Sequence, residues 1–512
     1  MTGYPRVLFA GDPAGPAAER PGPPEYLTDL NLDQVVAGMT EGRARYRLEE
    51  YFHAPLRDAR LIIDRQLVIR DLRRGDLQRR VAGFGQAMDR VRRYQQQAAT
   101  MRYPRQRARW QLDSQIAYIT AVETLLDDLT AADLRSRGLR AVRDWLTRLR
   151  TGPAFFTLRA DSVRVLTALD DVRYRLHING NRIHVTHDPD QSEDYSAAVR
   201  ATFHRFRQGA VPDHRIGVDE QQQMDHVQAG VLDLVAQLYP DVFTDLDRVT
   251  ERHQQFLDPV VVDFDRDIQF PLAYLDYIAP LTRAGLNFCL PSFGAGKEMD
   301  VTGTFDLALA RVLHGKGTQP VTNDITLCDG ERIMVVTGPN NGGKTTFART
   351  VGQLHHLARL GLPVPGRTAR LSLSDRVFTH FERLDAPATL RGTLHNDLLR
   401  VHDILDHATG DSVVILNELF TSTTLQDAVA LGSRLMGELV EKDLIAVYVT
   451  FIDELADHGP STVSLVAVVP PDDPTTRTFR IVRRRADGNA HALALAHRFG
   501  LTYPQLTRRL AS

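Results

Sequence analysis

The feature that most constrains the fold is a glycine-rich loop between an apolar run and a helical run. Residues 333–337 are apolar, helix-forming residues lie at 346–360, and between them stand Gly338, Pro339, Asn340, Asn341, Gly342, Gly343, Lys344, Thr345 and Thr346. This is the spacing G-x-x-x-x-G-K-T in its strand–loop–helix context. Its glycines let backbone N–H groups turn toward phosphates, and the helix N-terminus adds partial positive charge. We therefore expect these nine residues to bind ATP, with Lys344 on the β- and γ-phosphates and the Thr345 hydroxyl on Mg²⁺.

A second motif follows a hydrophobic strand at residues 413–416, which ends in Asn417 and Glu418. P-loop ATPases normally carry an acidic pair here: the first carboxylate holds Mg²⁺ through water, and the second polarises the attacking water. Glu418 is thus the candidate catalytic base. Asn417 offers Mg²⁺ a neutral oxygen, so we expect weaker metal binding and a slow ATPase. A nucleotide-binding switch that barely turns over is the alternative.

The residue pattern that indicates secondary structure changes near residue 300. After that point, short β-rich runs alternate with helices, which predicts an α/β domain with buried parallel strands. Before it the pattern is mainly helical, with prolines at 259, 271, 280 and 291 expected to break the last stretch into segments.

Two alternating runs flank Asn179-Gly180-Asn181 and predict a β-hairpin over 172–186. Residues 1–24 hold six prolines and four glycines and are expected to form a loose arm.

The charge is distributed unevenly along the chain. The net charge is −2, yet residues 41–150 carry 24 arginines and no lysine against 14 acidic residues, a local net charge of +10. The hairpin adds further arginines and histidines on one face. Two interpretations stay open: phosphate-binding surfaces for nucleic acid, or ordinary solvated helix and sheet faces.

Several protein classes are excluded by composition. Two cysteines are too few for a disulfide scaffold or a cysteine-rich zinc site. No apolar run reaches the ~18 residues that span a membrane, and no signal-peptide core follows the N-terminus. We expect a cytoplasmic protein without membrane contact; association with the nucleoid is an open alternative.

With these motifs placed, the chain resembles the MutS family of mismatch-repair ATPases over most of residues 320–512. TGPNNGGKTTFARTVGQL is similar to the family's TGPNMGGKST loop and the helix after it, SVVILNELFTSTTLQDA to SLVLLDEIGRGTSTxDG, and VYVTFIDEL to the ATHYHEL stretch. A weaker resemblance covers FHAPLRDARLIIDRQLVIRDL and IQFPLAYLDYIAPLTRAGLNFCLPSF upstream. We divide the chain into a Pro/Gly-rich N-terminal arm over 1–40 and two parts that the resemblance implies: a helical core, lever and clamp over 41–305, and an ABC-type, MutS-like P-loop ATPase over 306–512.

The departures from the family pattern concern polar contacts to nucleotide and metal. Asn417 replaces Asp, Phe451 replaces His, Gly392 stands at the signature Ser beside a retained Thr393, Phe420-Thr421-Ser422 replaces Gly-Arg-Gly, and Asp427 keeps its place. The resemblance implies that the signature region contacts nucleotide across a dimer and that Asp427 helps order that interface. Because several polar contacts to nucleotide and metal are altered together, we expect weakened or altered catalysis.

The resemblance implies a homodimeric, DNA-associated ATPase whose arms embrace duplex or branched DNA and move under ATP control. Direct mismatch readout is not expected, because none of the 21 phenylalanines is followed two residues later by Glu, as in the family's mismatch readers. About 40 residues before the lever-like region also leave no room for separate mismatch-recognition and connector domains, so a repair or recombination partner protein is an open candidate. The alternative function is a weakly hydrolysing, nucleotide-gated module that binds protein.

Overall fold

The computed structural model describes residues 6–8, 22–180, 182–188, 224–381, 392–470, 476–486 and 507. Internal contacts divide the chain into two compact units. Unit 1 comprises residues 1–75, 134–140 and 266–512, and unit 2 comprises residues 76–133 and 141–265. The chain therefore passes between the units four times, and each unit is built from segments that are distant in sequence.

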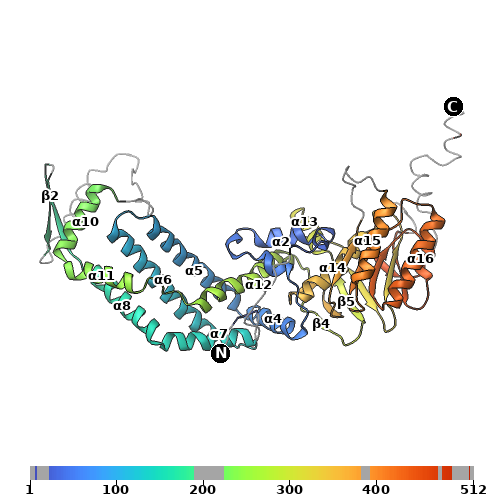
Figure 1. Ribbon diagram of the computed structural model, residues 1–512, viewed down its shortest axis with the longest axis horizontal. Coiled ribbons are helices and arrows are strands. Elements are labelled where there is room, and N and C mark those ends of the chain that lie inside the picture. Colours follow the sequence, from blue (N-terminus) through green and yellow to red (C-terminus); the bar gives the residue numbers. More distant parts are fainter. Residues whose placement is uncertain are drawn as a thin grey trace. The chain divides into compact units, whose positions relative to one another are not determined.

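Unit 2 is mainly helical. Its helices are α5 (Leu77–Thr100), α6 (Pro104–Ala131), most of α7 (Arg137–Thr151), α8 (Pro153–Asp170), α10 (His226–Leu238) and α11 (Pro240–Arg252). Helices α5 and α6 lie side by side (Figure 1). Along α6, the side chains of Ile119, Val122, Leu126 and Leu129 recur at steps of three or four residues and are all buried, so they form one apolar stripe. Proline begins three of these helices, where its missing N–H costs no hydrogen bond.

The predicted hairpin of unit 2 is confirmed. Strands β1 (Tyr174–Asn179) and β2 (Arg182–His187) pair antiparallel, with Asn179 opposite Arg182 across a turn at Gly180, whose φ is +62°. The apolar side chains of β1 remain exposed, Ile178 at 72%. The helical pattern that the sequence shows from about residue 193 lies, as far as residue 223, outside the described residues.

Unit 1 contains a six-stranded sheet in the order β10-β11-β12-β7-β13-β14. The strands are β7 (Ile333–Thr337), β10 (Val377–His380), β11 (Val413–Asn417), β12 (Ile445–Val449), β13 (Thr462–Ala467) and β14 (Ile481–Arg483). All neighbours pair parallel except β13 and β14. The sequence prediction of buried parallel strands at β7, β11, β12 and β13 is therefore confirmed.

Helices cover both faces of this sheet, as a parallel sheet requires. On one face, α15 (Thr393–His407) and α16 (Leu425–Glu441) pack over Val335, Leu416 and Tyr448. On the other, α14 (Lys344–Arg359) lies so close that a Cβ built on Gly352 would stand 2.6 Å from Cδ1 of Ile415. The phosphate loop is thus anchored by a helix in tight contact with the central strands.

Unit 1 also contains shorter helices and two small sheets. It includes the helices α1 (Tyr26–Asp29), α2 (Leu32–Thr40), α3 (Glu49–His53), α4 (Ala59–Leu72) and α13 (Leu307–Gly315), the 3₁₀ turns η1 (Ala44–Tyr46) and η2 (Asp453–Asp457), a small sheet of β4 (Ser292–Phe293), β9 (Thr368–Leu371), β5 (Met299–Thr304) and β6 (Asn323–Leu327), and the pair β3 (Phe288–Cys289) with β8 (Val364–Pro365). Residues 26–40, placed by the sequence in an N-terminal arm, form α1 and α2, and Leu30, Leu32 and Val35 are fully buried there.

The prediction that prolines break the helical stretch after residue 259 was wrong at two positions. Helix α12 (Pro259–Arg283) continues through Pro271 and Pro280. An interior proline costs a helix about 3 kcal/mol, mainly through a lost hydrogen bond and a clash with the preceding turn. Because almost every residue from 268 to 275 is buried, tertiary packing stabilises the helix against that cost.

No helix in the described ranges has both the length and the apolar character that crossing a bilayer demands.

The C-terminal end of α14 is fixed by Gly361. Its φ is +73°, and Leu362 N–H donates to Leu357 O at 3.1 Å, as in a Schellman motif. A Cβ on Gly361 would stand 2.7 Å from Cβ of Arg65 and 3.1 Å from the Ile62 carbonyl oxygen. Arg65, itself buried, donates to Leu360 O at 3.3 Å, so α4 packs against this end of α14 and is hydrogen-bonded to it.

We predict that Gly361→Ala lowers the free energy of unfolding by more than the ~1–2 kcal/mol that a left-handed backbone alone costs, because the methyl group also collides with α4. Gly285→Ala is the matched control, since Gly285 has φ +94° and open space around its Cβ. Denaturant unfolding followed by circular dichroism measures both. Equal losses in the two variants would contradict the steric part of the prediction.

Candidate nucleotide-binding site

Backbone geometry explains the glycines of the phosphate loop. Gly338 has φ +115° and Gly343 has φ +94°, conformations that side chains rarely adopt. A Cβ on Gly342 would stand 2.9 Å from the Pro339 carbonyl oxygen and 3.0 Å from Cβ of Ala467. Because α14 begins at Lys344, the loop presents a helix N-terminus, which favours anions.

Lys344 is folded back onto its own loop. Its ammonium group donates to Gly338 O at 2.9 Å and Pro339 O at 3.2 Å, and it lies 4.3 Å from the ring centroid of Phe451. Burial lowers the pKa of Lys344, while the Glu418 charge raises it and the Arg477 charge lowers it further. These contacts are weaker partners for an ammonium than a phosphate, because only a phosphate brings a full negative charge.

Thr345 and Asn417 meet at the carboxyl end of the sheet. The Thr345 hydroxyl donates to Asn417 Oδ1 at 2.9 Å. Asn417 is the last residue of β11, and Thr345 is the second residue of α14, so the two motifs found separately in the sequence are joined by this bond. Hydroxyl and amide oxygens are the hard donors that Mg²⁺ accepts, and Mg²⁺ needs only one or two protein ligands. This pair therefore fits Mg²⁺, with less negative charge than an aspartate would supply.

Glu418 follows directly in a left-handed backbone conformation, with φ +55°. Its N–H donates to Val449 O at 2.9 Å, which ties the turn to the end of β12. Glu418 also lines the same cavity as the phosphate loop. The candidate base is thus close to the phosphate site, on a turn with little conformational freedom.

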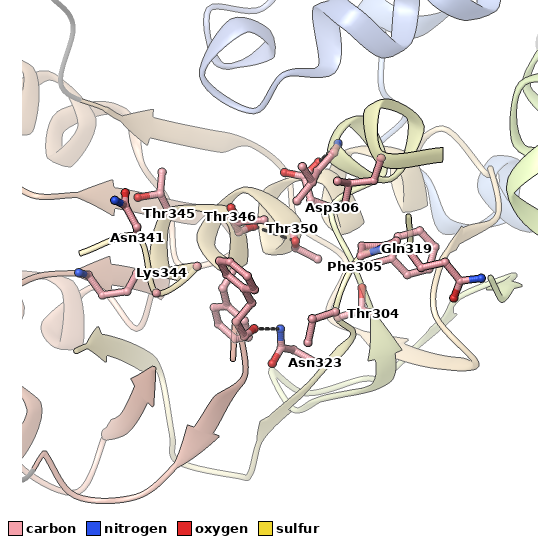
Figure 2. Close-up of a pocket in the computed structure, with 18 of the residues that line it drawn as sticks. Thr304, Phe305, Asp306, Gln319, Asn323, Asn341, Lys344, Thr345, Thr346 and Thr350 are labelled. Atoms are coloured by element: carbon pink, nitrogen blue, oxygen red, sulfur yellow. Dashed lines mark hydrogen bonds between the residues drawn. The ribbon is translucent and has the colours of Figure 1, made fainter. Parts of the chain in front are cut away.

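A cavity of about 900 Å³ lies beside the loop. Figure 2 shows Asn341, Lys344, Thr345 and Thr346 on one side of it and Thr304, Phe305, Asp306, Gln319 and Asn323 on the other. From the predicted phosphate loop, residues 340–346 line it, whereas Gly338 and Pro339 contribute the carbonyls that hold Lys344. The volume is in the range of small-molecule sites.

The structure places Thr393 and Asp427 outside the lining of this cavity. Thr393 is the first residue of α15. The Asp427 carboxylate accepts hydrogen bonds from the hydroxyls of Thr423 at 3.2 Å and Thr424 at 2.8 Å, which fixes the first turn of α16. Within one chain, neither residue is brought to the phosphate loop.

Sequence reasoning missed the segment 476–480, which reaches the loop from the strand β14. Arg477 Nε donates to Asn340 O at 3.0 Å, and the backbone of Phe479 lies 3.6 Å from the Cβ position of Gly343. Asn323 holds this segment: its Nδ2 donates to Phe479 O at 3.1 Å, drawn as the dashed line beside Asn323 in Figure 2, and its Oδ1 accepts from Ile481 N at 2.7 Å. No local motif marks these residues, because only the sheet topology brings them to the loop.

The cavity wall opposite the loop also carries polar groups that sequence reasoning missed. Thr304 is 1% exposed, and its hydroxyl has no hydrogen-bond partner among the described residues. Asp306 caps α13 by accepting from Leu309 N, and it accepts from Gln353 Nε2 at 3.0 Å. Burial raises the pKa of Asp306. This wall is therefore polar and well connected to α14 through Gln353.

Comparisons with known proteins point to one family. Residues 334–490 match the family model for MutS domain V. The DNA mismatch repair protein MutS of Synechococcus sp. (strain CC9902) is 28% identical over 210 residues, 40% of this chain and 23% of that protein. MutS of Thermotoga maritima is 26% identical over 268 residues, 51% and 32% of the two chains. The DNA mismatch repair protein msh3 of Botryotinia fuckeliana is 32% identical over 194 residues, 37% and 17%. The chain thus spans about a third or less of these relatives' lengths.

We predict that Lys344→Ala weakens binding of a fluorescent ATP analogue by about tenfold or more, because a charge-assisted contact to phosphate is lost. Lys442→Ala is the control, since Lys442 ends α16 outside the cavity lining. Titration by fluorescence anisotropy measures both affinities. Unchanged affinity in the Lys344 variant would remove this lysine from the site.

Proposed function

Because residues 334–490 match the family model for MutS domain V, we propose that this chain is a MutS-family, ATP-binding, DNA-associated ATPase. It acts as a homodimer on duplex or branched DNA and does not read mismatches directly. The observation that carries this proposal is the bond from Thr345 to Asn417, with Glu418 next in the chain and lining the phosphate-loop cavity.

The phosphate loop supplies the binding step. On ATP binding, Lys344 exchanges the Gly338 and Pro339 carbonyls for the β- and γ-phosphates, and the backbone N–H groups of 340–346 surround the phosphates. The nucleoside extends along the cavity toward the polar residues Thr304 and Asn323, where Phe479 also lines the cavity. Thr345 and Asn417 would hold Mg²⁺, which, when bound, neutralises charge on the phosphates.

Glu418 supplies the base for hydrolysis. Its carboxylate orients a water molecule for attack on the γ-phosphate and accepts a proton from it. Two features slow this step. Asn417 gives the metal no charge, and Phe451 offers an apolar ring where the family pattern has a polar histidine. We infer a slow ATPase that spends most of its cycle with nucleotide bound.

DNA binding is assigned to the arginine-rich helices of unit 2. Arg79, Arg90, Arg93 and Arg102 are exposed on α5 and just after it. Others nearby are engaged by carboxylates, for example Arg80 with Asp76 and Asp128. The exposed guanidinium groups suit DNA phosphates, which set position and carry little sequence information. ATP binding at the dimerised ATPase domains, with Thr393 and Asp427 at their interface, moves these arms; a repair or recombination protein supplies lesion recognition.

We predict that Glu418→Gln lowers the ATP turnover number by about 100-fold and leaves ATP affinity unchanged, because the amide cannot accept the proton. Phosphate release and analogue binding measure the two quantities. The matched variant Asn417→Asp is expected to raise turnover and to lower the Mg²⁺ concentration needed for half-maximal rate. Wild-type turnover in the Glu418 variant would exclude Glu418 as the base.

Binding to a perfect duplex, a G·T-mismatched duplex and a four-way junction tests the DNA assignment. We expect ATP-dependent binding near 0.15 M salt without mismatch preference, weakened several-fold by Arg90→Gln combined with Arg93→Gln. Salt is fixed because phosphate-dominated affinity falls steeply as salt rises. Absence of binding to all three would exclude the DNA role and favour a nucleotide-gated module that binds protein.

A further inference from the structure

The turn after β11 holds two residues in a conformation that non-glycine residues avoid. Glu418 has φ +55° and Phe420 has φ +62°. Each such residue costs about 1–3 kcal/mol and persists only where its surroundings enforce it. The family pattern has glycine at the position of Phe420, and glycine adopts this conformation at no steric cost, whereas Phe420 does not. The contacts that enforce the turn therefore bear on how Glu418 is presented.

One such contact comes from α15. The Phe420 N–H donates to Asp397 Oδ2 at 3.3 Å, and the Phe420 side chain is 2% exposed within the core between the sheet, α15 and α16. Asp397 is 8% exposed and lies about one turn after Thr393, the first residue of α15. A buried carboxylate thus links the start of α15 to the turn that carries Glu418.

The carboxylate of Asp397 is itself held in place. His380, the last residue of β10, has Nε2 3.0 Å from Asp397 Oδ1 and is 6% exposed. Arg400, two turns from the start of α15, donates to Thr379 O at 3.1 and 3.2 Å, which joins the helix to the same strand. Two points of attachment to β10 fix the rotation of α15 and leave Asp397 one orientation toward Phe420.

We propose that Asp397 is a positioning residue for the Glu418 turn: by binding the Phe420 N–H it maintains the left-handed backbone that directs Glu418 to the phosphate site. The inference rests on the proposed ATPase function. It adds that the N-terminal end of α15 and the candidate base move together. A contact that shifts Thr393 would therefore change the position of Glu418 through the hydrogen bond between Asp397 and the Phe420 N–H.

Amide hydrogen exchange tests the structural half of this proposal without any need for activity. In Asp397→Ala we expect faster exchange in the peptide that contains residues 418–422, with α15 otherwise protected. Asp397→Asn, which keeps an acceptor oxygen, is expected to restore most of the protection. Asp406→Ala is the control, because Asp406 is an exposed α15 carboxylate paired only with His402 among the contacts described. Unchanged exchange in Asp397→Ala overturns the proposal.

Kinetics test the functional half. We expect Asp397→Ala to lower turnover by about tenfold with ATP affinity within twofold, Asp397→Asn to recover most of it, and Asp397→Ala to cause no further loss in a Glu418→Gln background, because the two act as one unit. A full additional loss in that background overturns the proposal. Faster exchange in a protein whose wild type shows no Glu418-dependent turnover would instead refute the proposed ATPase function and support the positioning contact.

Discussion

The burial of α14 is the constraint on which the rest of unit 1 depends. This helix carries Lys344 and Thr345 at its start, and nearly every residue after Phe347 is buried. Gln353 in its middle binds Leu30 O, Leu307 N and Asp306 at once, and Arg359 at its end binds the carbonyls of Pro55 and Leu56. A helix held along its whole length by the sheet and by the N-terminal helices is a rigid support for a phosphate loop.

The proposed chemistry of the site depends on two less polar residues near the start of α14. Where the family pattern places charged or polar groups, this chain has an amide at Asn417 and an aromatic ring at Phe451. The structure shows both substitutions in contact with side chains that we propose bind Mg²⁺ and phosphate, Asn417 with Thr345 and Phe451 with Lys344. Under the proposed function, each contact competes within the protein with the metal or the phosphate. The departures therefore act together on one small region.

The parts of this site that local sequence encodes could be predicted, and the parts set by topology could not. The phosphate loop and the run ending in Asn417 and Glu418 are contiguous motifs, and the alternating runs beside Asn179 and Gly180 encode their own hairpin. Asn323 and Phe479 were missed because they meet only after β6 and β14 have taken their places, and helix α12 was misread because propensity rules ignore burial. Local sequence does not distinguish Asp397 from other polar residues of an amphipathic helix, because its partner Phe420 lies 23 residues away in the chain.

The path of the chain between the two units has a consequence for biosynthesis. Residues 22–75 belong to unit 1, and several of their partners lie after residue 266, such as Leu360, whose carbonyl accepts from Arg65, and Thr379, whose hydroxyl donates to Asp29. During translation, apolar residues of α1, α2 and α4 such as Leu30 and Ile62 therefore lack their later partners. They stay exposed to solvent until the whole of unit 2 has been synthesised and the sheet begins to form. Unit 2 has a core of its own, which includes Leu112, Val165 and Leu246. The N-terminal helices are the segment whose exposure a nascent-chain chaperone would have to cover.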